Sequence, residues 1–283
     1  IFAAKGRPAN HPLIVHVADA SGVDHFAANV PDFARRLIDA FWPGPLTLIL
    51  PRRPGVGAAA AGGQDSIGLR CPSHPVAQAV LRACAAQGVF GLAAPSANPF
   101  GRVSPTTAAH VQAGMGDALL VIDGGACDVG IESTIVDCTR GAPVLLRPGG
   151  ISRAQVEAAC GQPLRDGAAL DAPDPKASGT LLAHYAPAAP VRLMDAKALQ
   201  TALDLLGADA AHIATWSRAI LKTPSSSVIR RRMPDDAAAT AQQLFAVLRE
   251  FDAQGARLIW IESPPETPEW EAVRDRLQRA AAA

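Results

Sequence analysis

The sequence predicts an α/β protein of two domains, and three observations support this fold class. Short apolar, β-rich runs alternate with helical patterns through the front half of the 283-residue chain. Several of these runs are apolar on both faces, which is typical of a mixed sheet covered by helices. A stretch rich in Gly, Pro, Asp and Ala separates this half from a second, shorter α/β pattern. We therefore expect one domain in residues 1–160, a linker in 161–190 and a smaller α/β domain in 191–283.

Seven runs in the front half have the length and composition of strands: residues 13–17, 46–50, 67–71, 89–93, 119–122, 133–137 and 144–146. Helices are predicted at 31–41 and at 152–160, where Ser152 is the N-cap. Ser104 as N-cap, with Pro105 at the first helical position, predicts a further helix.

The second half follows a linker. Asp171-Ala-Pro-Asp-Pro lacks periodicity and is typical of an extended connection. Beyond it, strands are predicted at residues 191–194, 212–216, 227–231 and 258–261, and helices at 196–206, 235–254 and 268–283. This pattern suits a compact domain of about 90 residues.

Composition limits the functions that the chain can have. It carries 26 Lys and Arg against 26 Asp and Glu, so net charge does not favour a polyanionic partner. We see neither an apolar run of the roughly 18 residues that a membrane span needs nor a charged-then-apolar signal segment. The five cysteines have no CxxC or metal-ligand spacing, which favours reduced, mostly buried thiols. We therefore expect a cytoplasmic protein with no membrane partner and no protein-bound metal.

The first segment with chemical interest is Lys5-Gly-Arg-Pro, which precedes a predicted strand. Pro8 restricts Arg7 to extended backbone, and residues two apart in extended chain project to the same side. Lys5 and Arg7 would then form a clamp for triphosphate or bicarbonate. The alternative is a pair of solvated surface charges.

A second segment lies along the strand predicted near residues 67–71. Ser66, Gly68 and Arg70 share one face of it. Arg70, at the end of the strand, could bind a carboxylate through two hydrogen bonds. A surface salt bridge would give the same pattern.

Two further segments carry polar groups. Residues 94–107 place hydroxyls, an amide and a helix start after an apolar strand, where they offer donors to an anion. This loop is neither a Walker A loop nor GxGxxG, and a purely structural turn is the alternative. Farther on, Arg147 precedes a proline and is held extended. Glu132 could bind a cation or an amino group, or could pair with Arg70 or Arg147.

Together, the segments KGRPxxHPLIVHV, WPGPLTLIL, APSANPxGRVSPTT, GIESTIVD and LRPGGIS resemble the YrdC/Sua5 family and cover nearly all of residues 1–155. Residues 178–187, SGTLLAHYAP, and the α/β pattern after them look like the linker and C-terminal domain of the Sua5 form. The resemblance implies a YrdC-like twisted mixed sheet with helices and a smaller, Rossmann-like Sua5 domain.

The resemblance also implies an activity. Family members form L-threonylcarbamoyl-AMP and pyrophosphate from L-threonine, bicarbonate and ATP, with Mg²⁺ on the phosphates, for the threonylcarbamoyladenosine (t6A) modification of tRNA. The product would pass to the downstream tRNA threonylcarbamoyl-transfer machinery. The sequence shows no Ser-His-Asp set or activated cysteine, which fits a reaction that depends on positioning and fixed cations.

Particular residues match functional positions of the family. The positions that match ATP contacts are Arg7, His11, Ser66, Asn98, Thr106, Arg147 and, in the linker, His184 and Tyr185. The positions that match threonine contacts are His16, Arg70, Ser96 and Ser133. The resemblance implies that Lys5 and Arg7 are catalytic because they supply charge beside the phosphates, and that Arg70 fixes the threonine carboxylate.

The sequence departs from the family pattern at three places. Ile1 is not a methionine, and the chain starts after the usual Thr-Glu-Thr-x-Tyr-Gly-Leu segment, so we expect further residues upstream. Ala177-Ser178-Gly179 stands where the linker usually has Ser-Pro-Gly, and Phe100 replaces a common serine.

Other functions remain as alternatives. A double-stranded RNA-binding YrdC-like module without synthase activity is disfavoured by the near-neutral charge. A second alternative is carbamoyl transfer in hydrogenase maturation, but that function normally comes with acylphosphatase and zinc-finger-like segments, and the sequence shows neither. A third is a regulatory protein with a degenerate site, and the retained Lys5, Arg7 and Arg147 argue against it. The run at residues 230–232, three arginines, is interpreted as charge that protects a strand edge, with a weak RNA contact as the alternative.

Overall fold

The computed structural model describes residues 1–167 and 177–283, and the predicted extended run at 171–175 lies outside them. The chain divides into two compact units. The first unit contains Ile1–Ser96 and Glu132–Thr180, and the second contains Ala97–Ile131 and Leu181–Ala283. The middle of the front half, residues 97–131, therefore belongs to the same unit as the C-terminal α/β pattern.

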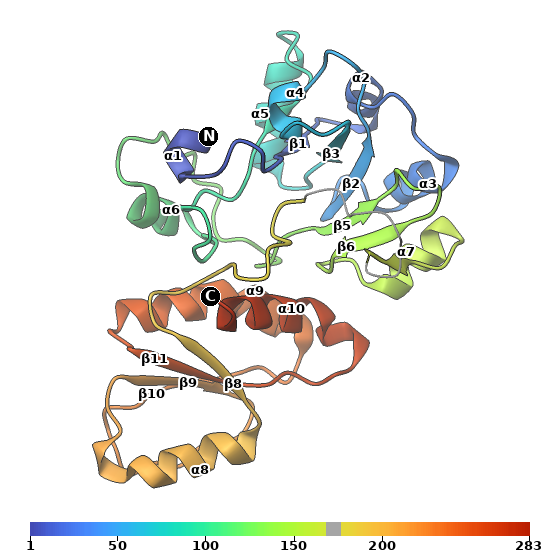
Figure 1. The fold of residues 1–283 in the computed structure, drawn as a ribbon. Coiled ribbons are helices and arrows are strands. Elements are labelled where there is room, and N and C mark those ends of the chain that lie inside the picture. Colours follow the sequence, from blue (N-terminus) through green and yellow to red (C-terminus); the bar gives the residue numbers. More distant parts are fainter. Residues whose placement is uncertain (168–176) are drawn as a thin grey trace. The chain divides into compact units, whose positions relative to one another are not determined.

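The first unit is built on a mixed sheet, as the sequence predicts (Figure 1). In its described part, seven strands pair in the order β4-β1-β3-β2-β5-β6-β7. The pairs β1/β3, β2/β5 and β6/β7 are parallel and the others are antiparallel. The strands are β1 (Ile14–His16), β2 (Leu46–Pro51), β3 (Ser66–Arg70), β4 (Leu92–Ala93), β5 (Thr134–Asp137), β6 (Val144–Arg147) and β7 (Arg165–Asp166).

Helices pack against this sheet. The helix α3 (Asp32–Phe41) buries Leu37 in one hydrophobic core with Leu48 of β2, and it contacts α7 (Arg153–Cys160). The predicted cap of α7 is confirmed. The Ser152 hydroxyl accepts a hydrogen bond from the backbone of Gln155, and the Gln155 side chain accepts one from the backbone of Ser152, which together form a capping box. The other helical elements of this unit are α1 (Phe2–Lys5), η1 (Ala20–Gly22), α2 (Val23–Phe26), α4 (Ala58–Ala61) and α5 (Pro75–Ala85).

The second unit contains a parallel sheet with helices on both faces, which matches the Rossmann-like prediction. Its described strands are β8 (Val191–Met194), β9 (Ile213–Ser217), β10 (Ile229–Arg232) and β11 (Leu258–Glu262), in the order β10-β9-β11-β8. Figure 1 shows α8 (Ala196–Leu206) on one face, and α9 (Ala237–Ala253) and α10 (Glu271–Ala281) on the other. The unit also contains α6 (Ala108–Met115), η3 (Gly207–Asp209) and η4 (Pro268–Trp270).

Two predictions for the front half are wrong. The helix expected to begin at Ser104 and Pro105 begins at residue 108, because Thr107 is an equally good cap and its hydroxyl accepts from the His110 amide at 3.2 Å. The strand expected at 119–122 is not formed in the described structure, and Leu120 is 94% exposed. An apolar run becomes a strand only where another strand offers pairing, which sequence alone does not reveal.

We predict that Gly149 is required for the position of β5. A Cβ at this residue would lie 2.3 Å from the backbone nitrogen of Thr134 and 2.6 Å from the carbonyl oxygen of Glu132. Gly149→Ala is therefore expected to lower the free energy of unfolding by about 2–3 kcal/mol in chemical denaturation. Gly114→Ala is the control, since its Cβ would meet only Pro99 Cδ at 3.7 Å inside α6. Equal stability of the two variants would contradict the prediction.

Candidate functional site

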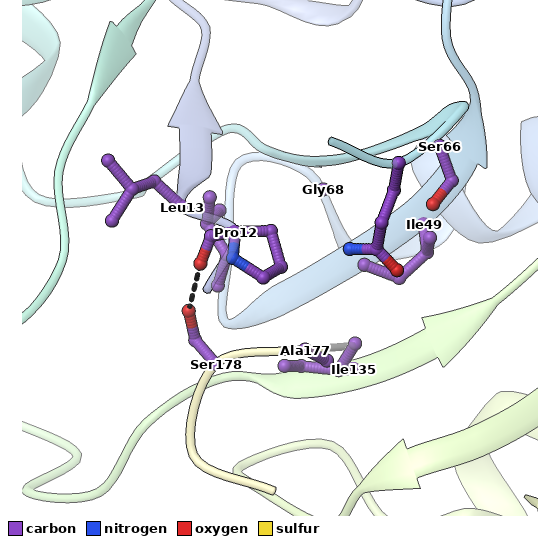
Figure 2. Close-up of a pocket in the computed structure, with 10 residues that line it drawn as sticks. Pro12, Leu13, Ile49, Ser66, Gly68, Ile135, Ala177 and Ser178 are labelled. Atoms are coloured by element: carbon purple, nitrogen blue, oxygen red, sulfur yellow. Dashed lines mark hydrogen bonds between the residues drawn. The ribbon is translucent and has the colours of Figure 1, made fainter. Parts of the chain in front are cut away.

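A pocket lies in the first unit beside β3, close to the segment that carries Ser178 (Figure 2). Gly68 forms part of its wall, and a Cβ there would approach Ile49 Cδ1 to 3.2 Å, so a side chain would narrow the pocket. Ser66 lies on the same face of β3 because successive side chains alternate in a strand. The pocket is small, with a cavity volume of about 10 Å³, and is lined by Pro12, Leu13, Ile14, Ile49, Gln64, Ser66, Gly68, Ile135, Ala177 and Ser178.

Ser178 links two buried arginines at the wall of this pocket. Arg7 Nη2 donates to Ser178 Oγ at 3.1 Å and to the carbonyl oxygen of Pro12 at 2.8 Å. Arg147 Nη1 donates to the carbonyl oxygen of Ser178 at 2.7 Å. The Ser178 hydroxyl donates in turn to the Pro12 carbonyl at 3.1 Å (Figure 2). Arg7 is 7% exposed and Arg147 is 3% exposed, so both guanidinium groups are held away from bulk water.

Lys5 adds a third buried cation to this unit. Lys5 ends α1, so the prediction that Lys5 and Arg7 lie two apart in extended chain is wrong. Gly6 follows in the left-handed region at φ 61° and caps the helix. Lys5 is 7% exposed and its Nζ donates to the Ser96 carbonyl at 2.6 Å. Burial, and secondarily the charge of Arg7, lowers the pKa of Lys5 to about 8. The alternative of two solvated surface charges is therefore wrong for Lys5 and Arg7.

A chain of hydrogen bonds fixes Ser133 at the start of β5. Its hydroxyl lies 2.7 Å from Thr47 Oγ1 of β2 and accepts from Arg147 Nη2 at 3.1 Å. The Ser133 carbonyl accepts from Arg147 Nε at 3.0 Å and from Nη2 at 2.8 Å. Ser133, Thr47 and Arg147 are all buried, so this network holds the hydroxyl in one orientation.

His16 and Arg70 are register partners in the pairing of β1 with β3. Burial, followed by the charge of Arg70, lowers the pKa of His16 to about 4, so its imidazole is neutral at pH 7. His16 Nδ1 is buried and has no hydrogen-bond partner within the described residues. Arg70 Nε donates to the Gly44 carbonyl at 3.0 Å, which fixes the guanidinium at the end of β3. This pair can offer a neutral ring nitrogen and a cation to one polar ligand.

The sequence-predicted residues are divided between the units. The first unit holds Lys5, Arg7, His11, His16, Ser66, Arg70, Ser96, Ser133 and Arg147, and the second holds Asn98, Thr106, His184 and Tyr185. Within the first unit, the backbone carbonyl of His11 accepts from Arg7 Nε at 3.4 Å.

In the second unit, several predicted residues also stabilise their own surroundings. The Asn98 amide donates to the carbonyls of Pro99 at 3.0 Å and Arg102 at 2.8 Å, which closes a turn. Thr106 Oγ1 lies 3.2 Å from His110 Nδ1, within hydrogen-bond distance. Tyr185 is 1% exposed, and the guanidinium of Arg276 lies 5.4 Å from the centre of its ring. The His184 ring packs edge-on against the Tyr185 ring, with 4.1 Å between the ring centres.

Sequence reasoning missed the roles of Thr47 and Ser178. Thr47 is the lone hydroxyl in the apolar run Leu-Thr-Leu-Ile-Leu, and a buried hydroxyl in such a run needs a partner, so this signal was available. Ser178 gave no comparable signal, because its contacts with Arg7 span 171 positions of the chain.

The described residues contain neither a cluster of metal ligands nor a helix that could span a membrane. Among them, no three His, Cys, Asp or Glu side chains gather as metal ligands. Within the same residues, no helix has both the length and the apolar character of a membrane span. The five cysteines are free thiols, of which Cys71, Cys138 and Cys160 are buried.

Similarities to known proteins agree with this architecture. Residues 1–149 match the Sua5/YciO/YrdC family model, described as telomere recombination, and residues 151–282 match the model described as the threonylcarbamoyl-AMP synthase C-terminal domain. A threonylcarbamoyl-AMP synthase of Bacillus subtilis is 36% identical over 99% of this chain and 82% of its own length. That of Pyrococcus abyssi is 35% identical, over 99% and 83%. The crystal structure of P. abyssi Sua5 complexed with L-threonine has a TM-score of 0.85 at 33% identity, covering 99% of this chain and 83% of that one.

We predict that Ser178 stabilises the first unit through its hydroxyl. Ser178→Ala removes the acceptor for Arg7 and the donor to Pro12, and is expected to lower the free energy of unfolding by about 1–2 kcal/mol. Chemical denaturation measures this change. Thr180→Ala is the control, because it removes one hydroxyl that, among the residues the structure describes, bonds only to the nearby Ala177 carbonyl at 3.0 Å. A loss as large in the control would contradict the linking role.

We predict that Lys5 makes stability rise at alkaline pH. The pKa of Lys5 is about 8 in the folded chain, below its ordinary value of 10.5, so between these pH values the unfolded chain binds more protons than the folded chain. The free energy of unfolding, relative to that of Lys5→Met, is therefore expected to increase by about 2 kcal/mol from pH 7 to pH 10. Paired denaturation curves at both pH values measure the difference. A constant difference would show that the buried ammonium is not destabilised.

Proposed function

Because the chain belongs to the Sua5-type threonylcarbamoyl-AMP synthase family, we propose that this nucleotidyltransferase-type enzyme forms L-threonylcarbamoyl-AMP and pyrophosphate from L-threonine, bicarbonate and ATP. The observation that carries the proposal is the group of buried cations, Lys5, Arg7 and Arg147, in the same unit as the paired His16 and Arg70. Several cations such as Lys5, Arg7 and Arg147 suit the binding of phosphates, and a single cation such as Arg70 suits the carboxylate of an amino acid.

Two bond-forming steps make up the proposed reaction. The threonine amine attacks the carbon of bicarbonate, a C–N bond forms, and water leaves to give a carbamate. A carbamate oxygen then attacks the α-phosphorus of ATP, and the bond to the bridging oxygen breaks as pyrophosphate departs. Mg²⁺ enters with the nucleotide as part of the substrate and neutralises phosphate charge.

Lys5, Arg7 and Arg147 would bind the phosphates. Burial, and secondarily repulsion from the charge of Arg7, lowers the pKa of Lys5. A bound triphosphate relieves this repulsion, and the benefit grows as charge develops on the leaving pyrophosphate. Ser66, which lines the neighbouring pocket, is proposed as a further ATP contact together with His11.

The threonine would be held by the groups near β1, β3 and β5. Arg70 would bind its carboxylate, while the neutral His16 and the hydroxyls of Ser96 and Ser133 would bind its polar groups. Since Ser133 is oriented by Thr47, its hydroxyl can select a side-chain hydroxyl of fixed position.

Four positions in the second unit remain proposed ATP contacts on the family resemblance alone: Asn98, Thr106, His184 and Tyr185. The near-complete burial of Tyr185 beside Phe245 supports an anchoring contribution for its ring.

The product is a mixed carbamic–phosphoric anhydride, which is reactive towards amines and water. We therefore propose that it is consumed promptly in the cytoplasm by tRNA threonylcarbamoyl-transfer machinery, which places the chain in the t6A modification of tRNA.

We predict threonine-dependent release of pyrophosphate from ATP in the presence of bicarbonate. Arg7→Ala is expected to lower kcat/KM by about a hundredfold or more, because it removes a phosphate-binding charge. Arg70→Ala is expected to raise the KM for threonine by about tenfold or more. Arg35→Ala is the control, since it removes an exposed cation that pairs with Asp24 at 3.2 Å.

Release of pyrophosphate at the same rate with and without threonine would contradict this proposal. An RNA-binding module would instead bind double-stranded RNA with an affinity that falls steeply as salt is added.

A further inference from the structure

The second unit contains a depression at the carboxyl ends of β9 and β10, on the face of the sheet that carries α8. Its lining consists of Thr215, Ser217 and residues 219–221 and 230–232. Its volume is about 350 Å³, at the lower end of the range of small-molecule sites. Ligands of open parallel sheets often bind at the carboxyl ends of strands. The reaction proposed above makes no use of this site.

Strand pairing divides the three arginines of β10 between two faces. Arg230 pairs with Thr215 and Arg232 with Ser217, whereas Arg231 pairs with Trp216. Trp216 lies in the core with α9, and Arg231 forms an ion pair with Glu250 of that helix at 3.2 Å. Arg230 and Arg232 therefore share the opposite face, which is the face of the depression. Arg231 also borders the depression, but its guanidinium is paired with Glu250.

Both of these cations are available to a ligand. Within the described residues, Arg230 has no ion-pair or hydrogen-bond partner for its guanidinium. Arg232 lies 3.2 Å from Asp235, but the side chains are 53% and 75% exposed, and such a surface pair contributes little stability. The two positions are about 7 Å apart along the strand, a span that suits two neighbouring phosphate groups.

The nearest buried carboxylate does not cancel this charge. Glu262 Oε2 accepts from the backbone nitrogens of Arg218 at 2.7 Å and Ala219 at 2.9 Å, and from the Ser217 hydroxyl at 2.6 Å. Its Oε1 is paired with Arg218 Nη2 at 2.6 Å. The carboxylate is thus neutralised in place, and it fixes the turn after β9 that forms one wall of the depression.

The same wall is apolar at its rim. Ile220 is 85% exposed and lies next to the buried Leu221. A ligand that carries phosphates and a flat or apolar body could contact both the arginines and this rim. Protection of a strand edge accounts for charge on β10, because it is the outer strand, but it does not require a walled depression.

We propose that this depression binds a small phosphorylated molecule with two adjacent phosphates, of the nucleoside di- or triphosphate class. Arg230 and Arg232 bind the phosphates, and the Ile220 rim contacts the rest of the molecule. A nucleic acid backbone fits less well, because the chain has equal numbers of acidic and basic residues.

Amide NMR of the isotope-labelled chain, titrated with inorganic pyrophosphate, tests the proposal residue by residue. Signals of residues 215–221 and 229–232 are expected to shift, and they are separate from signals of the first unit. The double variant Arg230→Ala, Arg232→Ala should weaken this binding by about tenfold or more. Arg231→Ala is the matched control on the other face and should change it less than about twofold.

A third variant keeps the test independent of folding defects. Asp235→Asn removes the carboxylate that competes for Arg232, so it should tighten pyrophosphate binding by about twofold. Absence of shifts at millimolar pyrophosphate, or equal weakening by Arg231→Ala, would overturn the proposal. So would a single-stranded oligoribonucleotide that shifts these amides when pyrophosphate does not, because it would mark a nucleic acid surface.

Discussion

Arg147 holds together parts of the first unit that are far apart in the sequence, and the geometry of the candidate site depends on it. Its guanidinium donates to the carbonyl and hydroxyl of Ser133 and to the carbonyl of Ser178. The end of β6 is thereby fixed to the start of β5 and to the segment near residue 178. Since Ser178 also accepts from Arg7, one network positions both guanidinium groups. Each of these bonds is buried or partly buried, so the loss of one partner would leave a desolvated polar group.

This arrangement keeps positive charge away from water at a cost in stability. The lowered pKa of Lys5 is one sign of that cost, since burial and the neighbouring Arg7 both disfavour the ammonium form. Carbonyl oxygens of Pro12, Ser178 and Ser96 replace part of the lost hydration. For the proposed binding of phosphate, such a site would not have to reorganise its dipoles, which is the condition for strong electrostatic stabilisation of a reacting anion.

The second unit handles charge in a different way. Glu262, at the end of β11, accepts hydrogen bonds from hydroxyl, backbone and guanidinium donors, so its negative charge is compensated by groups of the same unit. The arginines of β10 are instead separated by the alternation of side chains along the strand. One therefore stabilises the packing of α9, and two face a depression. The same run of residues can protect a strand edge and bind a ligand, because the two functions use different faces.

The sequence by itself determined the α/β class, most strand positions and the cationic segments around Arg7 and Arg147, because these depend on local signals such as apolar runs, prolines and caps. It placed α8 at residues 196–206 as observed. It failed where two local signals competed, as at the caps of α6, and where an apolar run at 119–122 found no strand to pair with. Only the tertiary structure decided that Thr47 orients Ser133 and that Ser178 joins Arg7 to Arg147. These contacts connect positions 31 to 171 residues apart, and no local preference of the chain encodes them.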